Sequence, residues 1–111
     1  DLNSTNLSSR SISDLNKLAN ILKQFPDIHL EIRAHTDSRG NPKYNLSLSE
    51  QRAQSAVNYL ISRGVPKNRL SAKGYGDTML LNECDRGVVC SEEKHRENRR
   101  VEFMIRKIVN E

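Results

Sequence analysis

The chain has 111 residues, of which 35% are apolar and 29% are charged, so we expect one globular domain spanning residues 1–111, without room for a second. It contains no run of eighteen apolar residues, and Asp1 is not followed by a signal-like segment, so we expect a mature or trimmed domain that is not itself inserted in a membrane. The formal charge of +4 gives a mild preference for anionic partners, while the two Phe and three Tyr residues do not alternate with basic ones, which argues against nucleic-acid binding.

A helix and a strand are predicted first. Apolar residues recur at helical spacing at Leu15, Leu18, Ala19 and Leu22. Ser11 and Asp14 resemble a capping pair at the start of this helix, and Phe25 is expected to be its last core contact. Pro26 ends the helix, because proline disfavours helical geometry at the residue before it. Apolar and polar side chains alternate over residues 28–35, which predicts a strand with one buried face.

A second helix and strand follow a polar loop. Ser47 and Glu50 form a capping box, so we expect the second helix to begin there. Its apolar stripe consists of Ala53, Ala56, Val57, Leu60 and Ile61. Gly64 lies where a helix C-cap belongs. Residues 70–75 are typical of a strand, and its small side chains let the backbone pack closely against a neighbour.

The last third of the chain combines a long loop with a short helix and a final strand. The loop runs from Gly76 to about Ser91. Ser91 suits the N-cap of a short helix, and the acidic residues that follow it suit the first turn, because negative side chains oppose the positive N-terminal end of a helix. Residues 101–106 alternate again, which predicts a strand. The order helix, strand, helix, strand, short helix, strand indicates a sheet with helices packed on it, in the α/β or α+β class.

Two cysteines lie in the long loop, at Cys84 and Cys90, and three interpretations are open. They can form a disulfide, which would indicate an oxidising compartment. They can be half of a zinc site, although zinc needs four ligands and only His95 is a nearby candidate. They can also be two buried free thiols.

Asp37 follows the first strand, and Arg52 belongs to the expected first turns of the second helix. Ligands of such sheets bind at strand ends and helix N-termini, so we expect both charges to line one pocket. A carboxylate accepts hydrogen bonds from an ammonium group and a guanidinium clamps a carboxylate, so the pair suits a zwitterion such as the free end of an amino acid. The alternative is that Asp37 and Arg52 pair with each other as a loop staple.

An enzyme is the less favoured interpretation of the same region. His35 and Ser49 could supply a base and a nucleophile, but no Gly-x-Ser-x-Gly motif is present. Ser49 is sufficiently explained by a capping role at the helix start. We therefore expect no catalytic residues.

Motifs distributed along the chain carry a resemblance to a known family. They are Thr36-Asp37-Ser38-Arg39-Gly40, Tyr44-Asn45-Leu46-Ser47-Leu48-Ser49, Arg52-Ala53, Arg63-Gly64-Val65, Gly74-Tyr75-Gly76 and Asn98-Arg99-Arg100-Val101-Glu102-Phe103. In this order they resemble the OmpA-like C-terminal domain, the peptidoglycan-anchoring module of outer-membrane proteins, Pal-type lipoproteins and flagellar stator proteins such as MotB. The resemblance extends from about Leu15 to Ile108.

The resemblance implies an α+β fold of the βαβαβ type, a mixed sheet with helices on one face. The first strand is expected to be truncated, since only Asp1 and Leu2 could remain of it. It also implies non-covalent binding of peptidoglycan through the diaminopimelate residue of the stem peptide. Asp37 would receive the α-ammonium group of that residue and Arg52 would hold its α-carboxylate.

Three supporting positions are implied in the same way: Asn45 in the loop before the helix, Arg99, and Asn3 near the start of the chain. The alternatives are a turn-stabilising side chain for Asn45 and a salt bridge to the loop or to Glu97 for Arg99. Neither a cofactor nor a metal is implied.

Some relatives carry a similar cysteine pair, which favours a Cys84–Cys90 disulfide and a periplasmic location, tethered to the outer membrane of a Gram-negative bacterium. The competing function is a protein–protein interaction module of an envelope or stator complex that does not bind wall peptide. A zinc-dependent hydrolase is the third possibility.

Overall fold

The computed structural model describes residues 7–108. Its elements are α1 (Ser9–Gln24), β1 (Ile28–His35), α2 (Pro42–Ser62), the 3-10 helix η1 (Lys67–Arg69), β2 (Leu70–Gly76), α3 (Glu92–Asn98) and β3 (Arg100–Ile108). Apart from η1, which was not predicted, the order and types of these elements are those predicted from the sequence, and the α+β class is confirmed. No helix in this range is both long and apolar enough to cross a lipid bilayer.

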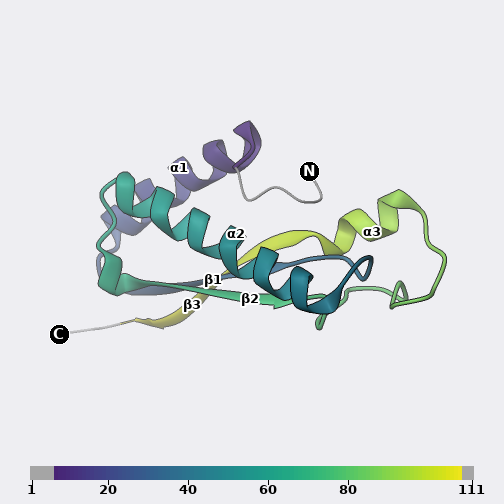
Figure 1. Ribbon diagram of the computed structural model, residues 1–111. Coiled ribbons are helices and arrows are strands. Elements are labelled where there is room, and N and C mark those ends of the chain that lie inside the picture. Colours follow the sequence, from purple (N-terminus) through teal and green to yellow (C-terminus); the bar gives the residue numbers. More distant parts are fainter. Residues whose placement is uncertain (1–6, 109–111) are drawn as a thin grey trace.

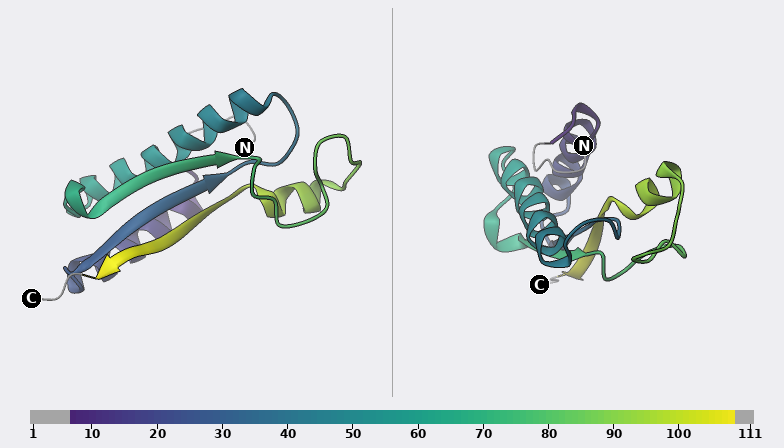
Figure 2. Two further views of the ribbon diagram at one scale, coloured as in Figure 1. Left: turned by 90° about the horizontal axis from the view of Figure 1, so that it is seen from below. Right: turned by 45° about the vertical axis from the view of Figure 1, so that its right-hand side comes forward.

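The three strands form a mixed sheet in the order β2-β1-β3. β1 is parallel to β2, to which it connects through α2, and antiparallel to β3. α1 and α2 lie on one face of this sheet (Figure 1), and α3 lies beyond the ends of the strands (Figure 2). Because His35 at the end of β1 is opposite both Gly76 and Arg100, the end of β1 meets the end of β2 and the start of β3. The candidate site residue Asp37 lies near this meeting point, two residues beyond the end of β1.

The core fills the space between the two long helices and the sheet. It is built from Leu15, Ala19, Leu22, Leu30, Ile32, Ala34, Ala53, Ala56, Val57, Leu60, Val65 and Leu70. The residues predicted to face inward from the first two helices and β1 are largely these. Phe25 is an exception, since it is more than half exposed rather than a last core contact.

α2 approaches β2 closely at Gly74. A Cβ atom at this position would lie 2.2 Å from the backbone nitrogen of Glu50 and 2.6 Å from the carbonyl carbon of Ser49. The close packing predicted from the small residues of this strand is therefore present. It fixes the height of α2 above the sheet.

The predicted starts of the first two helices were wrong, whereas the predicted cap of α3 at Ser91 is confirmed. α1 is capped by Ser8, whose hydroxyl oxygen accepts a hydrogen bond from the backbone N–H of Ser11, so Ser11 lies inside the helix. α2 begins at Pro42, and Asn41 caps it through its side-chain oxygen. An Asn cap followed by proline satisfies the first turn earlier than the Ser47 capping box would, so the box is overridden.

Candidate functional site

Asp37 lies two residues beyond β1 and is 98% buried, with 2% of its surface exposed. Its Oδ1 atom accepts hydrogen bonds from the backbone N–H of Arg39 at 2.9 Å and from the Arg39 Nε at 3.3 Å. Its Oδ2 atom accepts from Arg39 Nη2 and from Arg99 Nη1, each at 2.8 Å. Two guanidinium groups therefore surround one buried carboxylate.

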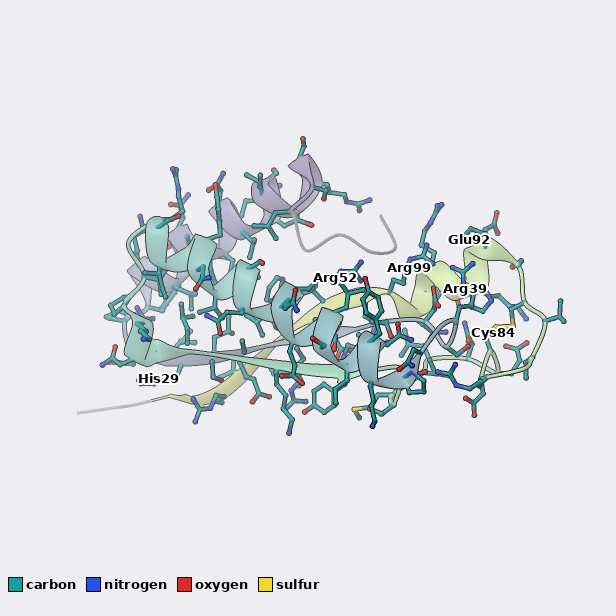
Figure 3. All side chains as sticks on the ribbon, viewed as in Figure 1. His29, Arg39, Arg52, Cys84, Glu92 and Arg99 are labelled. Carbon is teal, nitrogen blue, oxygen red and sulfur yellow. A yellow bond between two sulfur atoms is a disulfide. The ribbon has the colours of Figure 1, made fainter. Side chains whose placement is uncertain are left out.

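Glu92, in the first turn of α3, binds both of these arginines from the other side. Arg99 Nη2 lies 2.8 Å from Glu92 Oε1, and Arg39 Nη1 lies 3.2 Å from Glu92 Oε2. Figure 3 shows Arg39, Glu92 and Arg99 together at the end of the sheet next to α3, far from His29 at the opposite end. The four side chains form a network of alternating charge.

These contacts set the ionisation of Asp37. Burial by itself raises the pKa of Asp37, but hydrogen bonds from Arg39 and Arg99 outweigh it and lower the pKa to about 2. The same contact with Asp37 raises the pKa of Arg39. The site thus keeps a buried carboxylate that is ionised at neutral pH.

The ionised Asp37 is expected to stabilise the fold in a pH-dependent way. A carboxyl whose pKa falls from 3.8 to about 2 on folding contributes about 2 kcal/mol. Because the folded pKa is the lower one, this contribution is complete above the unfolded pKa and is lost as the pH falls through the folded pKa. The free energies of unfolding of the native protein and of Asp37→Asn, measured with urea, should differ by about 2 kcal/mol at pH 7. This difference should disappear as the pH falls from 4 to 2. A difference that stays constant down to pH 2 would contradict this account.

Asn45 was expected in the loop before the second helix, and that prediction was wrong, because α2 already begins at Pro42. Asn45 is buried in the first part of the helix. Its Nδ2 donates to the carbonyl oxygen of Arg39 at 2.9 Å and more weakly to that of Asp37 at 3.4 Å. Asn45 therefore fixes the backbone of the loop that carries Asp37.

Arg52 lies in the middle of α2, not in its first turns as predicted, and it is half-buried. It lines a groove of about 780 Å³, whereas Asp37 lines a neighbouring cavity of about 220 Å³. Arg99 lines both. The structure thus places Asp37 and Arg52 on two adjoining cavities that share Arg99, where we had expected a single pocket.

The groove at Arg52 is strongly cationic. Arg10, Arg96, Arg99 and Arg100 line it together with Arg52. Burial lowers the pKa of Arg52, and the positive charge of Arg99 lowers it further. Figure 3 shows Arg52 on the side of α2 that faces Arg99. Repulsion between two guanidinium groups makes this groove favourable for an anion.

Arg99 and Asn3 are the other two residues that the sequence pointed to. Arg99 lies against Asp37, 62 residues away in sequence, and its salt bridges go to Asp37 and Glu92. The alternative partner Glu97 instead accepts a hydrogen bond from Asn82. Asn3 lies outside the described residues.

The cysteine loop packs directly against the loop that carries Asp37. Cys84 and Cys90 form a disulfide, as the resemblance favoured. Ser38 Oγ donates a hydrogen bond of 2.5 Å to the carbonyl oxygen of the buried Cys84, and Arg86 binds the carbonyl oxygen of Gly40. Within residues 7–108, no three His, Cys, Asp or Glu side chains are grouped to hold a metal ion. Sequence reasoning missed these contacts, since they join segments about 46 positions apart without a local pattern.

His35 and Ser49 both have structural roles. His35 Nε2 lies 2.7 Å from Glu102 Oε1, the ring stacks on Tyr75, and burial lowers the pKa of the imidazole. Ser49 is buried inside α2, not at its start, so the capping role expected for it was wrong. Its Oγ donates to the carbonyl oxygen of Leu46 and accepts from the backbone N–H of Gly76, each at 2.8 Å.

The sequence matches one protein family and several characterised relatives. A family model described as the OmpA family matches residues 1–96. The peptidoglycan-associated lipoprotein of Rhizobium meliloti is 36% identical over 85 residues, which are 77% of this chain and 48% of that protein. The chain therefore spans about half the length of this relative.

Solved structures share the fold. The C-terminal domain of Helicobacter pylori MotB superposes with a TM-score of 0.84 at 27% identity, covering 96% of this chain and 80% of that one. The peptidoglycan-associated lipoprotein from Burkholderia pseudomallei superposes with a TM-score of 0.83 at 27% identity, covering 93% of this chain and 83% of that one. These likenesses agree with the mixed sheet and one-sided helical layer described above.

Proposed function

The chain belongs to the OmpA family, and we propose that it is a non-catalytic module that binds peptidoglycan through the diaminopimelate residue of the stem peptide. Its relatives include proteins named for their association with peptidoglycan, and this supports cell-wall anchoring as the general role. The choice of diaminopimelate as the recognised group rests on the charges of the site.

The observation that carries this proposal is the buried, ionised Asp37 beside the cationic groove at Arg52. Diaminopimelate in a stem peptide presents a free amino-acid end with one ammonium and one carboxylate group. The ammonium group would bind Asp37, and the carboxylate would bind Arg52 through two parallel hydrogen bonds. The ligand would cross the boundary between the two cavities, where Arg99 lies.

We place this module in the periplasm of a Gram-negative bacterium. The Cys84–Cys90 disulfide suits an oxidising compartment. Because the chain spans about half of its lipoprotein relative, we propose that it is the wall-binding part of a larger outer-membrane protein or lipoprotein. The rest of that protein would connect the outer membrane to the wall.

Arg52→Lys tests the carboxylate contact. Lysine keeps the positive charge but cannot form the two parallel hydrogen bonds of a guanidinium group, so binding should weaken about tenfold. The measurement is co-sedimentation of the purified domain with isolated sacculi over a range of protein concentrations.

The matched control is Arg63→Lys, since Arg63 is exposed at the far end of α2. This control should sediment like the native protein. If Arg52→Lys and Arg63→Lys bind sacculi equally well, Arg52 does not hold the carboxylate. If the native protein itself fails to sediment, an interaction module without wall-peptide binding is the better account.

A further inference from the structure

The place where a ligand ammonium group would bind Asp37 is already occupied by a cation of the chain itself. An ionised carboxylate offers about four lone-pair sites. The Oδ1 atom of Asp37 receives the backbone N–H and the Nε of Arg39, and Oδ2 receives Arg39 Nη2 and Arg99 Nη1. An ammonium group can therefore reach this carboxylate only by replacing one of these donors.

The side chain of Arg39 is the donor best able to leave. It is 40% exposed, compared with 15% for Arg99, and it extends from a loop, whereas Arg99 is held between the end of α3 and the start of β3. The backbone N–H of Arg39 also binds Asp37, but it is held in place, because Asn45 binds the carbonyl oxygen of the same residue. Departure of the guanidinium group would free one position on Oδ2 and one on Oδ1.

A second carboxylate is available to receive Arg39 when it leaves. Glu92 is half exposed and already lies 3.2 Å from Arg39 Nη1 and 3.4 Å from Nη2. Rotation of the Arg39 side chain would thus exchange one carboxylate partner for another without leaving a charge unpaired. Arg99 would stay in contact with both acids, because its two Nη atoms bind Asp37 and Glu92 separately.

We propose that the Arg39 side chain is a built-in competitor for the ammonium subsite of Asp37 and that this side chain moves onto Glu92 when the ligand binds. This inference rests on the proposed function and adds a specificity-determining residue to it. If Arg39 covers Asp37 nine-tenths of the time, the apparent affinity for the ligand is about tenfold weaker than that of the open site. A simple amine, which lacks a carboxylate for Arg52, displaces Arg39 poorly, whereas a zwitterion gains both contacts.

The test is a titration of free meso-diaminopimelate into the protein with its disulfide intact, with binding measured from the backbone amide chemical shifts. Arg39→Ala should bind about fivefold to tenfold more tightly than the native protein. Arg63→Ala, at an exposed arginine on the far end of α2, should bind like the native protein. Equal or weaker binding by Arg39→Ala, with a native amide spectrum, overturns the proposal.

Glu92→Gln supplies a second test, and its measurement in the native background does not depend on the folding of the Arg39 variant. Removing the alternative partner of Arg39 should weaken binding about threefold or more in the native background, on the same competition argument. It should have no effect when combined with Arg39→Ala. Equal weakening in both backgrounds would mean that Glu92 acts through Arg99, and it would overturn the exchange.

Different results would contradict the competitor role of Arg39 and the proposed function. If the native protein binds diaminopimelate, Asp37→Ala binds it at least about tenfold more weakly, and Arg39→Ala binds no more tightly than the native protein, the competitor role is wrong and the proposed function stands. If neither the native protein nor Arg39→Ala responds to diaminopimelate at millimolar concentration, both proposals are wrong.

Discussion

Replacing Asp37 with alanine should weaken binding to purified sacculi between about tenfold and a hundredfold. A hydrogen bond to a charged group contributes about 1.5–3 kcal/mol, and the ammonium group would lose its only carboxylate partner in the proposed complex. The loss should be larger than that of Arg52→Lys, because lysine at position 52 keeps part of the electrostatic attraction. Co-sedimentation with sacculi measures both variants on the same scale.

Asp37→Ala removes the side-chain oxygen that accepts from the backbone N–H of Arg39 as well as the charge, so a second variant is needed to test the charge alone. Asp37→Asn keeps the size of the side chain and an oxygen that can accept from the backbone N–H of Arg39, but it lacks the charge. It should lose binding nearly as strongly as Asp37→Ala. Asp27→Ala, at an exposed acid before β1, should bind normally. Normal binding by Asp37→Asn would show that the charge of Asp37 is not what the ligand recognises.

The Gly74→Ala variant should be severely destabilised. The added Cβ would lie 2.2 Å from the backbone nitrogen of Glu50, and helix backbone cannot rotate aside as a side chain can. α2 would have to move away from β2, at a cost of about 3 kcal/mol or more. For a domain of this size that lowers the Tm by more than about 10 °C. Thermal unfolding followed by circular dichroism measures the change.

Gly87→Ala is the matched control for Gly74→Ala. Gly87 lies in the disulfide loop with a φ of 87°, and a Cβ added there meets no atom within 4 Å. The substitution should cost only about 1–2 kcal/mol, for the left-handed backbone alone. If Gly74→Ala is no less stable than Gly87→Ala, the close approach of α2 to β2 does not exist in solution.

The order of elements could be predicted because each has a local signal. The alternation over residues 28–35 identified β1, and Pro26 identified the end of α1. The start of α2 was misplaced by weighting the Ser47 capping box above Asn41 and Pro42, although an N-cap residue followed by proline is itself a helix-start signal. That misplacement also moved Asn45 out of the helix and gave Ser49 a capping role that it does not have.

The candidate site could be predicted only in part. Asp37 and Arg52 were named from their expected places at a strand end and a helix start, and from a family resemblance. The carboxylate network could not be predicted, because Arg99 and Glu92 reach Asp37 and Arg39 through the meeting of β1, β3 and α3. The contact between Arg39 and Asp37 is local and could have been anticipated, since an aspartate in a loop often binds the backbone two residues ahead.

The central claim is that a buried anion and a neighbouring cation together bind the free amino-acid end of diaminopimelate. The most direct measurement compares, by amide chemical shifts, a stem peptide that ends in meso-diaminopimelate with two derivatives, one acetylated on the free amino group of that residue and one amidated on the carboxylate at the same end. The account predicts saturable shifts around Asp37, Arg52 and Arg99 with the unmodified compound, and at least tenfold weaker binding when either group is blocked. Equal binding of all three compounds, or shifts confined to other parts of the domain, would contradict it.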